Sequence, residues 1–154
     1  MSDFATITER EITLISRFIA LLKDEQEVLK RADAEALPEI GAAKIELVEQ
    51  LNSLEAERRS ALGIASNEKT RAAMTEWLAK HPKELTAAVN WENLLNLARE
   101  AKQLQEINGR LVDMHLQQTS EALAVLTRQS ERQTLYGSNG QAAQVSGSRI
   151  VDSA

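Results

Sequence analysis

The longest helical pattern in the chain covers residues 91–134, and no proline interrupts it. Along it, apolar and small residues recur three or four positions apart, which is the spacing of one face of an α-helix. Asn90 stands directly before the pattern, and its residue type is favoured at helix N-caps, so it predicts the start. The face comprises Trp91, Leu94, Leu95, Ala98, Ala101, Leu104, Asn108, Leu111, Val112, Leu116, Leu123 and Leu126.

A shorter helical pattern occupies the N-terminal part of the chain. Thr8 and Glu11 have the spacing of a capping box, which predicts a helix start near Thr8. Ile7 and Ile12 have the spacing of the hydrophobic staple that accompanies such a start. Two adjacent apolar rows follow, so this helix should contact two neighbours. The rows are Ile12, Ile15, Ile19, Leu22 and Leu29, and Leu14, Phe18, Leu21 and Val28.

A second short pattern follows a predicted turn at residues 33–37. It begins near Pro38, because proline is tolerated in the first turn of a helix, and Gly63 is its expected stop. Its apolar seam also contains Lys44 and Arg58, whose charged ends we expect to reach solvent at the edge of the bundle. The seam comprises Leu37, Ile40, Lys44, Leu47, Leu51, Leu54 and Arg58.

One further short helix completes the predicted fold. Met74, Trp77 and Leu78 indicate an amphipathic segment that Pro82 ends. We therefore predict an all-α fold, an antiparallel helical bundle or coiled coil of three main helices and one short helix over residues 1–134. Residues 135–154 contain three of the chain's six glycines and four serines, and we expect a flexible C-terminal tail there.

The predicted helices differ in length. At ~1.5 Å per residue the first two span about 36–40 Å and the last roughly 66 Å, so about 15–20 of its residues should project beyond the bundle. This outer part keeps an apolar stripe that an isolated helix cannot bury. The stripe could pack back through the short helix around Trp77, or it could bind a partner. It comprises Val112, Leu116, Thr119, Leu123 and Leu126.

The composition excludes several classes of function. The net charge of −5 and the lack of a long basic run argue against nucleic-acid binding and against an anionic membrane surface. The chain has no cysteine and no apolar run of about 18 residues, and its start lacks the basic and apolar regions of a secretory signal. We therefore expect a cytoplasmic protein without membrane insertion.

The sequence offers no catalytic or cofactor chemistry. His81 and His115 lie far apart, and neither has the spacing of metal ligands. The sequence contains neither a glycine-rich phosphate loop nor a serine nucleophile elbow. We therefore expect no enzyme activity, no metal site and no cofactor.

Two pairs of residues in the predicted helices are best explained by structural roles. Asn108 and Gly109 suit a polar position that fixes helix register beside a glycine that permits close approach of another helix. The alternative is a hinge for the outer part of the long helix, and we favour the first interpretation. Trp77 and Trp91 are expected to pack in the core or at its edge.

Four segments of the chain share features with one known family. Residues 33–37 read Asp-Ala-Glu-Ala-Leu between the first two helices, and the long last helix is rich in asparagine. Residues 135–141 contain Leu-Tyr-Gly-x-x-Gly-Gln, and residues 148–154 read Ser-Arg-Ile-Val-Asp-Ser-Ala. Together these segments resemble the FlgN family of flagellar export chaperones over essentially the whole chain.

The resemblance implies a cytoplasmic type III secretion chaperone. Members of the family bind the hook–filament junction proteins FlgK and FlgL, keep their C-terminal helices soluble and deliver them to the export gate protein FlhA. In members of the family, the C-terminal part of the chain binds the substrate, in agreement with a cargo site on the apolar stripe. The tyrosine of the Leu-Tyr-Gly motif is implicated in docking to the gate, which points to Leu135, Tyr136 and Gly137.

Two other interpretations of the stripe stay open. One is a structural coiled-coil protein in which the stripe is the seam of a homodimer. The other is a regulatory adaptor that carries no export cargo. Ile150 and Val151 have no assigned partner.

Overall fold

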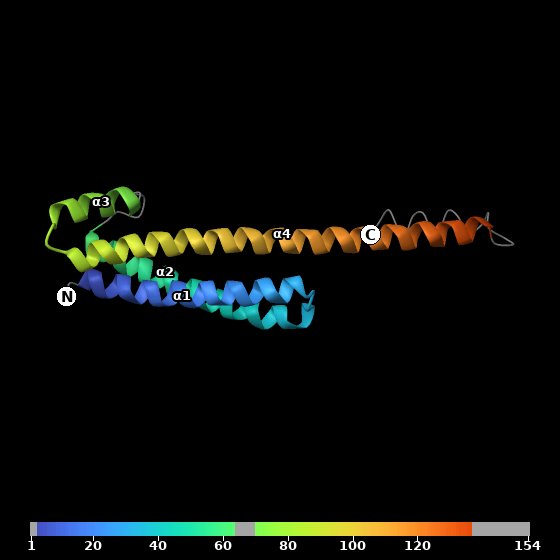
Figure 1. Cartoon of the computed structure of the whole chain (residues 1–154), viewed down its shortest axis with the longest axis horizontal. Helices are drawn as coiled ribbons and strands as arrows, with labels where there is room; N and C mark the ends of the chain where they lie inside the picture. The colour runs from blue at the N-terminus through green and yellow to red at the C-terminus, as the bar shows by residue number, and fades with distance from the viewer. Residues whose placement is uncertain (1–2, 64–69, 137–154) are drawn as a thin grey trace. The chain divides into compact units, whose positions relative to one another are not determined.

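A computed structural model describes residues 3–63 and 70–136, and the chain is helical there except for short connections (Figure 1). The described residues contain no strand, so the predicted all-α bundle is confirmed. The chain divides into two units, Met1–Leu111 and Val112–Ala154. The elements in order are α1 (Asp3–Lys30), the 3-10 helix η1 (Ala34–Ala36), α2 (Leu37–Leu62), α3 (Thr70–Lys80) and α4 (Leu85–Tyr136).

In the first unit, α1 and α2 form an antiparallel hairpin, and residues 85–111 of α4 lie against both of its helices (Figure 1). The core gathers where these helices and α3 meet. Leu22 and Met74 are fully buried, and burial of each such side chain contributes about 1.5–3 kcal/mol. The buried core cluster comprises Phe4, Ala5, Ile15, Ile19, Leu22, Met74, Ala87, Trp91, Leu94 and Ala101.

The ends of α2 and α3 agree with the sequence. Pro38 lies in the first turn of α2, where its missing N–H costs no helical hydrogen bond. Gly63 ends α2 with φ of 67° and donates its N–H to the carbonyls of Arg59 and Ser60. Glycine reaches this left-handed conformation without steric strain, so Gly63 is a suitable C-cap. At the end of α3, the His81 ring stacks on Trp77 with their centroids 4.2 Å apart.

The predicted starts of two helices are wrong. α1 begins at Asp3, and Thr8 lies inside it, donating its hydroxyl to the carbonyls of Phe4 and Ala5 at 3.1 and 2.9 Å. Because Thr8 is not an N-cap, the capping box with Glu11 and the staple between Ile7 and Ile12 do not exist. The chain instead continues the helix toward its N-terminus, where the buried side chains of Phe4 and Ala5 stabilise the added turn.

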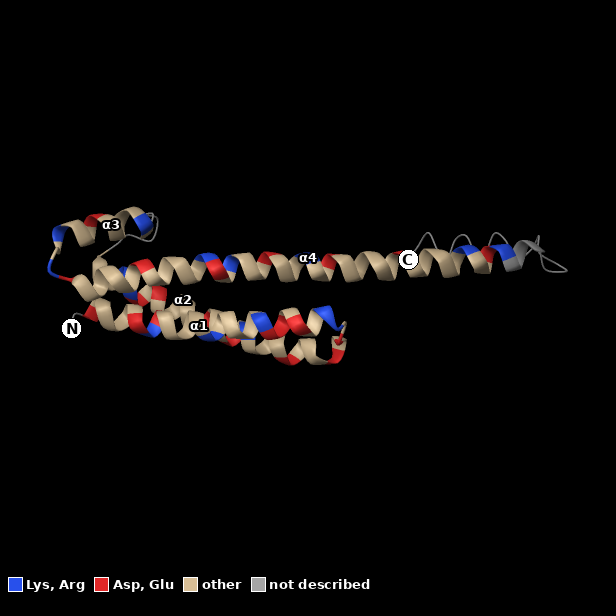
Figure 2. Cartoon of the chain, viewed as in Figure 1, with Lys and Arg blue, Asp and Glu red and all other residues tan. Residues whose placement is uncertain are grey.

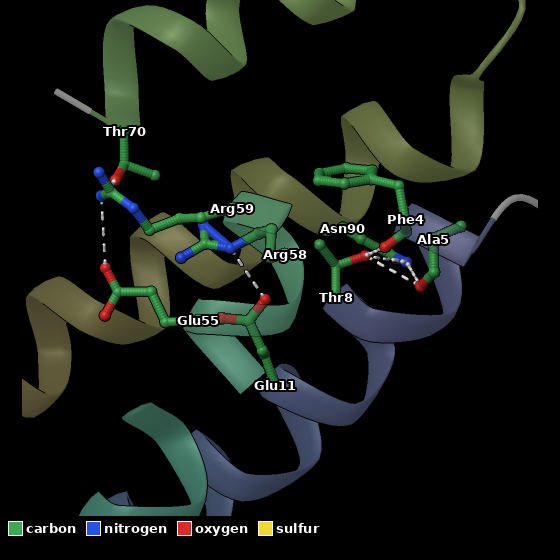
Figure 3. A network of polar contacts seen from close by, with 9 residues as sticks. All are labelled: Phe4, Ala5, Thr8, Glu11, Glu55, Arg58, Arg59, Thr70 and Asn90. Carbon is green, nitrogen blue, oxygen red and sulfur yellow. Dashed lines mark hydrogen bonds and ion pairs between the residues drawn. The ribbon is translucent and has the colours of Figure 1, made fainter. Parts of the chain in front are cut away.

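Asn90 is likewise internal, because α4 begins at Leu85. Its amide nitrogen donates to the Ala5 carbonyl and to the Thr8 hydroxyl, both at 3.2 Å. Asn90 and Thr8 are each buried, so a polar pair joins the start of α4 to the start of α1 (Figure 3). Residue types that often cap helices serve here as a buried contact between two helices.

The two cations in the α2 seam are not at a solvent-exposed edge. Arg58 is 5% exposed, and its Nε lies 3.1 Å from Glu11 Oε1 (Figure 3). Lys44 donates to both carboxylate oxygens of Glu25 at 3.1 Å and to Gln105 at 3.0 Å. The prediction that these charged ends reach solvent is therefore wrong. Each cation lies against a carboxyl group on α1, Arg58 against Glu11 and Lys44 against Glu25, which reduces the cost of burial.

Candidate functional site

The predicted outer stripe lies on the helical part of the second unit. Val112, Leu116, Leu123 and Leu126 are 41%, 64%, 59% and 62% exposed, and Thr119 is also exposed. Large apolar side chains that repeat along one face and remain in water indicate a surface for another protein. The alternative in which the stripe packs against the Trp77 helix stays a prediction.

The stripe follows the heptad positions of α4 with one shift in phase. Along the part that packs on the hairpin, the buried and partly buried positions alternate steps of three and four residues. These positions are Leu94, Leu97, Ala101, Leu104 and Asn108. Two consecutive steps of four, from Asn108 to Val112 and from Val112 to Leu116, break this alternation. An extra step of four residues in a heptad pattern is called a stutter, and it locally changes how the helix supercoils around a partner. The stutter coincides with the boundary between the two units.

The hairpin-facing side of α4 differs from the stripe because it carries buried polar groups. Asn108 is 2% exposed, and its amide nitrogen donates to the Leu22 carbonyl and to Glu25 Oε1, both at 2.9 Å. The same Glu25 carboxylate pairs with Lys44, which also donates to Gln105. One polar network thus joins α1, α2 and α4, and it favours a single register between them. The five stripe residues include no amide or charged side chain that would fix the register of a partner helix in this way.

A second polar cluster lies near the other end of the hairpin. The Arg58 guanidinium lies 4.9 Å from the centre of the Trp91 ring. Arg58 also pairs with Glu11 (Figure 3). Burial raises the pKa of Glu11 to about 7, while Arg58 opposes the rise and Glu55 adds to it. Trp91 packs in the core and Trp77 at its edge, as the sequence predicts. Both polar clusters serve packing between the helices of the first unit.

The interpretation of the Asn108–Gly109 pair is half right. Asn108 is the buried register-fixing residue that the sequence predicts. Gly109 permits no close helix approach, because a Cβ built there would have no heavy atom within 4 Å. No described contact therefore requires glycine at this position.

Replacing Gly109 with alanine is expected to raise the free energy of unfolding by about 0.8–1 kcal/mol, because alanine loses less backbone entropy in a helix. Gly41, inside α2, also has open space around a built Cβ and provides a matched control. Urea unfolding followed by circular dichroism should give similar gains for Gly109→Ala and Gly41→Ala. A loss of stability in Gly109→Ala alone would show a contact that needs glycine.

The motif assigned to the export gate lies at the limit of the described chain. Leu135 and Tyr136 are the last residues of α4, and Gly137 and the tail lie outside the described residues. Whether residues 135–154 form a separate flexible segment, and what Ile150 and Val151 contact, stay predictions.

The described residues give no sign of a metal or membrane site. Within residues 3–63 and 70–136, no three histidine, cysteine or acidic side chains gather closely enough to hold a metal ion. In the same part of the chain, no helix combines the length and the apolar character that a membrane span needs.

Comparison with known proteins identifies the family to which the chain belongs. Residues 1–144 match the family described as FlgN protein. A stretch of 52 residues is 40% identical to the flagella synthesis protein FlgN of Proteus mirabilis and covers 34% of this chain and 35% of that protein. The match therefore spans about a third of the length of this curated relative. No solved structure matches the chain.

Proposed function

Because the chain belongs to the FlgN family, we propose that it is a cytoplasmic flagellar export chaperone for hook–filament junction proteins. Its cargo is the terminal helices of FlgK-like and FlgL-like proteins, which it keeps from associating too early. It then delivers them to the export gate protein FlhA. Such a function needs no nucleotide, metal or catalytic residue.

The observation that carries this proposal is the exposed stripe of Val112, Leu116, Thr119, Leu123 and Leu126. An amphipathic cargo helix that covers it removes two apolar faces from water at once. Each leucine contributes on the order of 1.5–3 kcal/mol before the cost of ordering both partners. A few such contacts are enough for micromolar affinity, which suits a carrier that must also release its cargo.

Leu123→Asp is expected to weaken cargo binding about 30-fold or more, which corresponds to roughly 2 kcal/mol, and to leave the fold intact. The full-length chain would be co-purified with the terminal helices of a junction protein. Val125→Asp is the matched control, because Val125 is 52% exposed on another face of the same helix. Equal loss in both variants would contradict a cargo site on the stripe.

The same experiment with the gate protein tests the second half of the proposal. Tyr136→Ala should keep the cargo and lose binding to FlhA, because Tyr136 lies at the end of α4, beyond the last residue of the stripe, Leu126. If Leu123→Asp and Tyr136→Ala both bind cargo and gate normally, the site assignment is wrong.

A homodimeric coiled-coil adaptor is the competing function. The stripe has heptad spacing, so two copies could bury it against each other. Sedimentation over a wide concentration range separates the two functions. A tight dimer that Leu123→Asp dissociates would support the adaptor and leave no free cargo surface.

A further inference from the structure

The stripe on the second unit is narrower than the hairpin-facing side of α4. In the first unit, partly buried leucines at 95, 97 and 104 pack against the core on both sides of the seam, and α4 contacts two helices there. From Val112 to Leu126 the positions that border the a and d seam carry no large apolar residue, and the two other exposed large apolar residues, Met114 and Val125, lie farther from the seam. A seam restricted to these positions has the width of a contact with one helix.

The residues that border the seam are almost uncharged. With 100° per residue, three residues lie along one edge and three along the other. Only Asp113 among the six is an acid, a lysine or an arginine, and the corresponding part of α4 is mostly tan in Figure 2. Charges at these edge positions normally set the partner and the register of a coiled coil. The edges are Asp113, Ser120 and Thr127, and His115, Ala122 and Gln129.

We propose that the seam binds a single amphipathic helix of about 15 residues, as a two-stranded coiled coil held by apolar contacts without charge pairs at its edges. This inference rests on the proposed function, because that function supplies a foreign helix as the occupant. The length follows from the pattern, since the next seam positions after Leu126 are the polar Ser130 and Gln133.

Edges whose one acid, lysine or arginine is Asp113 have two consequences for the partner. Binding is nearly independent of salt, because no exposed ion pair contributes to it. The seam also accepts different helices whose a and d positions are apolar, because Asp113 is the one acid, lysine or arginine at its edges that could reject a wrong neighbour. One surface can thereby serve more than one cargo.

The test uses three synthetic helices with leucine at the a and d positions and with glutamine, glutamate or lysine at both edges. Calorimetry with the full-length chain gives affinity and stoichiometry at about 0.1 M and about 1 M salt, between which the Debye length falls from ~10 Å to ~3 Å. We expect one glutamine-edged peptide per chain and less than a twofold change with salt. Two peptides per chain, a tenfold loss at high salt or no binding would overturn the inference.

Adding charge to one edge sharpens the test. The double variant Ser120→Glu/Thr127→Glu should prefer the lysine-edged over the glutamate-edged peptide by about fivefold at low salt, and lose this preference at high salt. Gln118→Glu adds a charge on the exposed back of the helix and should show no preference. A similar preference in the Gln118→Glu control, or none in the double variant, would show that these edges do not border the partner.

The designed peptides separate this inference from the proposed function. If they bind as expected and junction-protein helices do not, the single-helix seam holds and the cargo assignment fails. If junction-protein helices bind but Leu123→Asp leaves both kinds of ligand attached, the seam is not the binding surface. A dimer of the chain that Leu123→Asp dissociates would show that a second copy is the occupant.

Discussion

Asn108→Asp is expected to lower the free energy of unfolding by about 3 kcal/mol at pH 7, although the two side chains have nearly the same shape. The substitution replaces the amide nitrogen that donates to the Leu22 carbonyl and to Glu25 Oε1 by an oxygen that repels both. The site is 2% exposed, so water cannot screen the second carboxylate. Lys44 offsets only part of this repulsion, because it already pairs with Glu25.

Urea unfolding followed by circular dichroism gives the size of the effect. Asn96→Asp is the control, because Asn96 is exposed on α4 and accepts a hydrogen bond from Arg99 at 2.9 Å. A carboxylate suits that donor, so this control should lose little or no stability. Acid should partly restore Asn108→Asp by protonating one of the paired carboxylates. A loss below about 1 kcal/mol for Asn108→Asp would mean that the network does not hold α4 on the hairpin.

Much of the fold could be predicted because apolar periodicity survives in the local sequence. The 3–4 spacing of Ile15, Ile19 and Leu22 identifies the buried side of α1 without knowledge of its neighbours. Pro38 and Gly63 act through the conformation of their own backbone, so their positions at the ends of α2 could also be predicted.

The failed predictions share one physical cause, which is that a polar residue in a helix depends on what lies opposite. Thr8 and Asn90 have good capping chemistry, but they lie 82 residues apart and bond to each other inside the core. The sequence predicts Arg58 at an exposed edge, because it does not show that Glu11 lies opposite Arg58 on α1. Contacts between helices determine where these polar side chains lie, and these contacts cannot be predicted from the local sequence.

The candidate site shows the same division. The sequence predicts an exposed stripe from the unequal lengths of the helices, and Leu116 and Leu123 are exposed in the structure. The partner could not be predicted from periodicity, since a homodimer seam and a cargo seam follow the same heptad. The family match, rather than the geometry, favours cargo.

The free energy of unfolding of the wild-type chain should fall relative to that of Glu11→Gln by about 3 kcal/mol as the pH rises from 4.5 to above 7. Burial raises the pKa of Glu11 from 4.5 to about 7, so the folded state holds this proton more tightly than the unfolded state. The stabilisation is therefore complete below pH 4.5 and is lost as the pH passes the folded value. Arg58 opposes the shift from α2, and Glu55 on the same helix increases it.

Urea unfolding of both proteins between pH 4.5 and 8 gives the difference curve, in which most other carboxylates cancel. Glu57→Gln is the control, because Glu57 makes only an exposed pair with Arg10 at 3.4 Å and should give a nearly flat curve. Carbon-13 resonances of the Glu11 carboxyl would report its pKa directly. If the difference curve rises with pH, or if Glu11 titrates below 4.5, then the charge on Arg58 outweighs the cost of burial. The pair would then be permanently ionised and would hold α1 to α2 at every physiological pH.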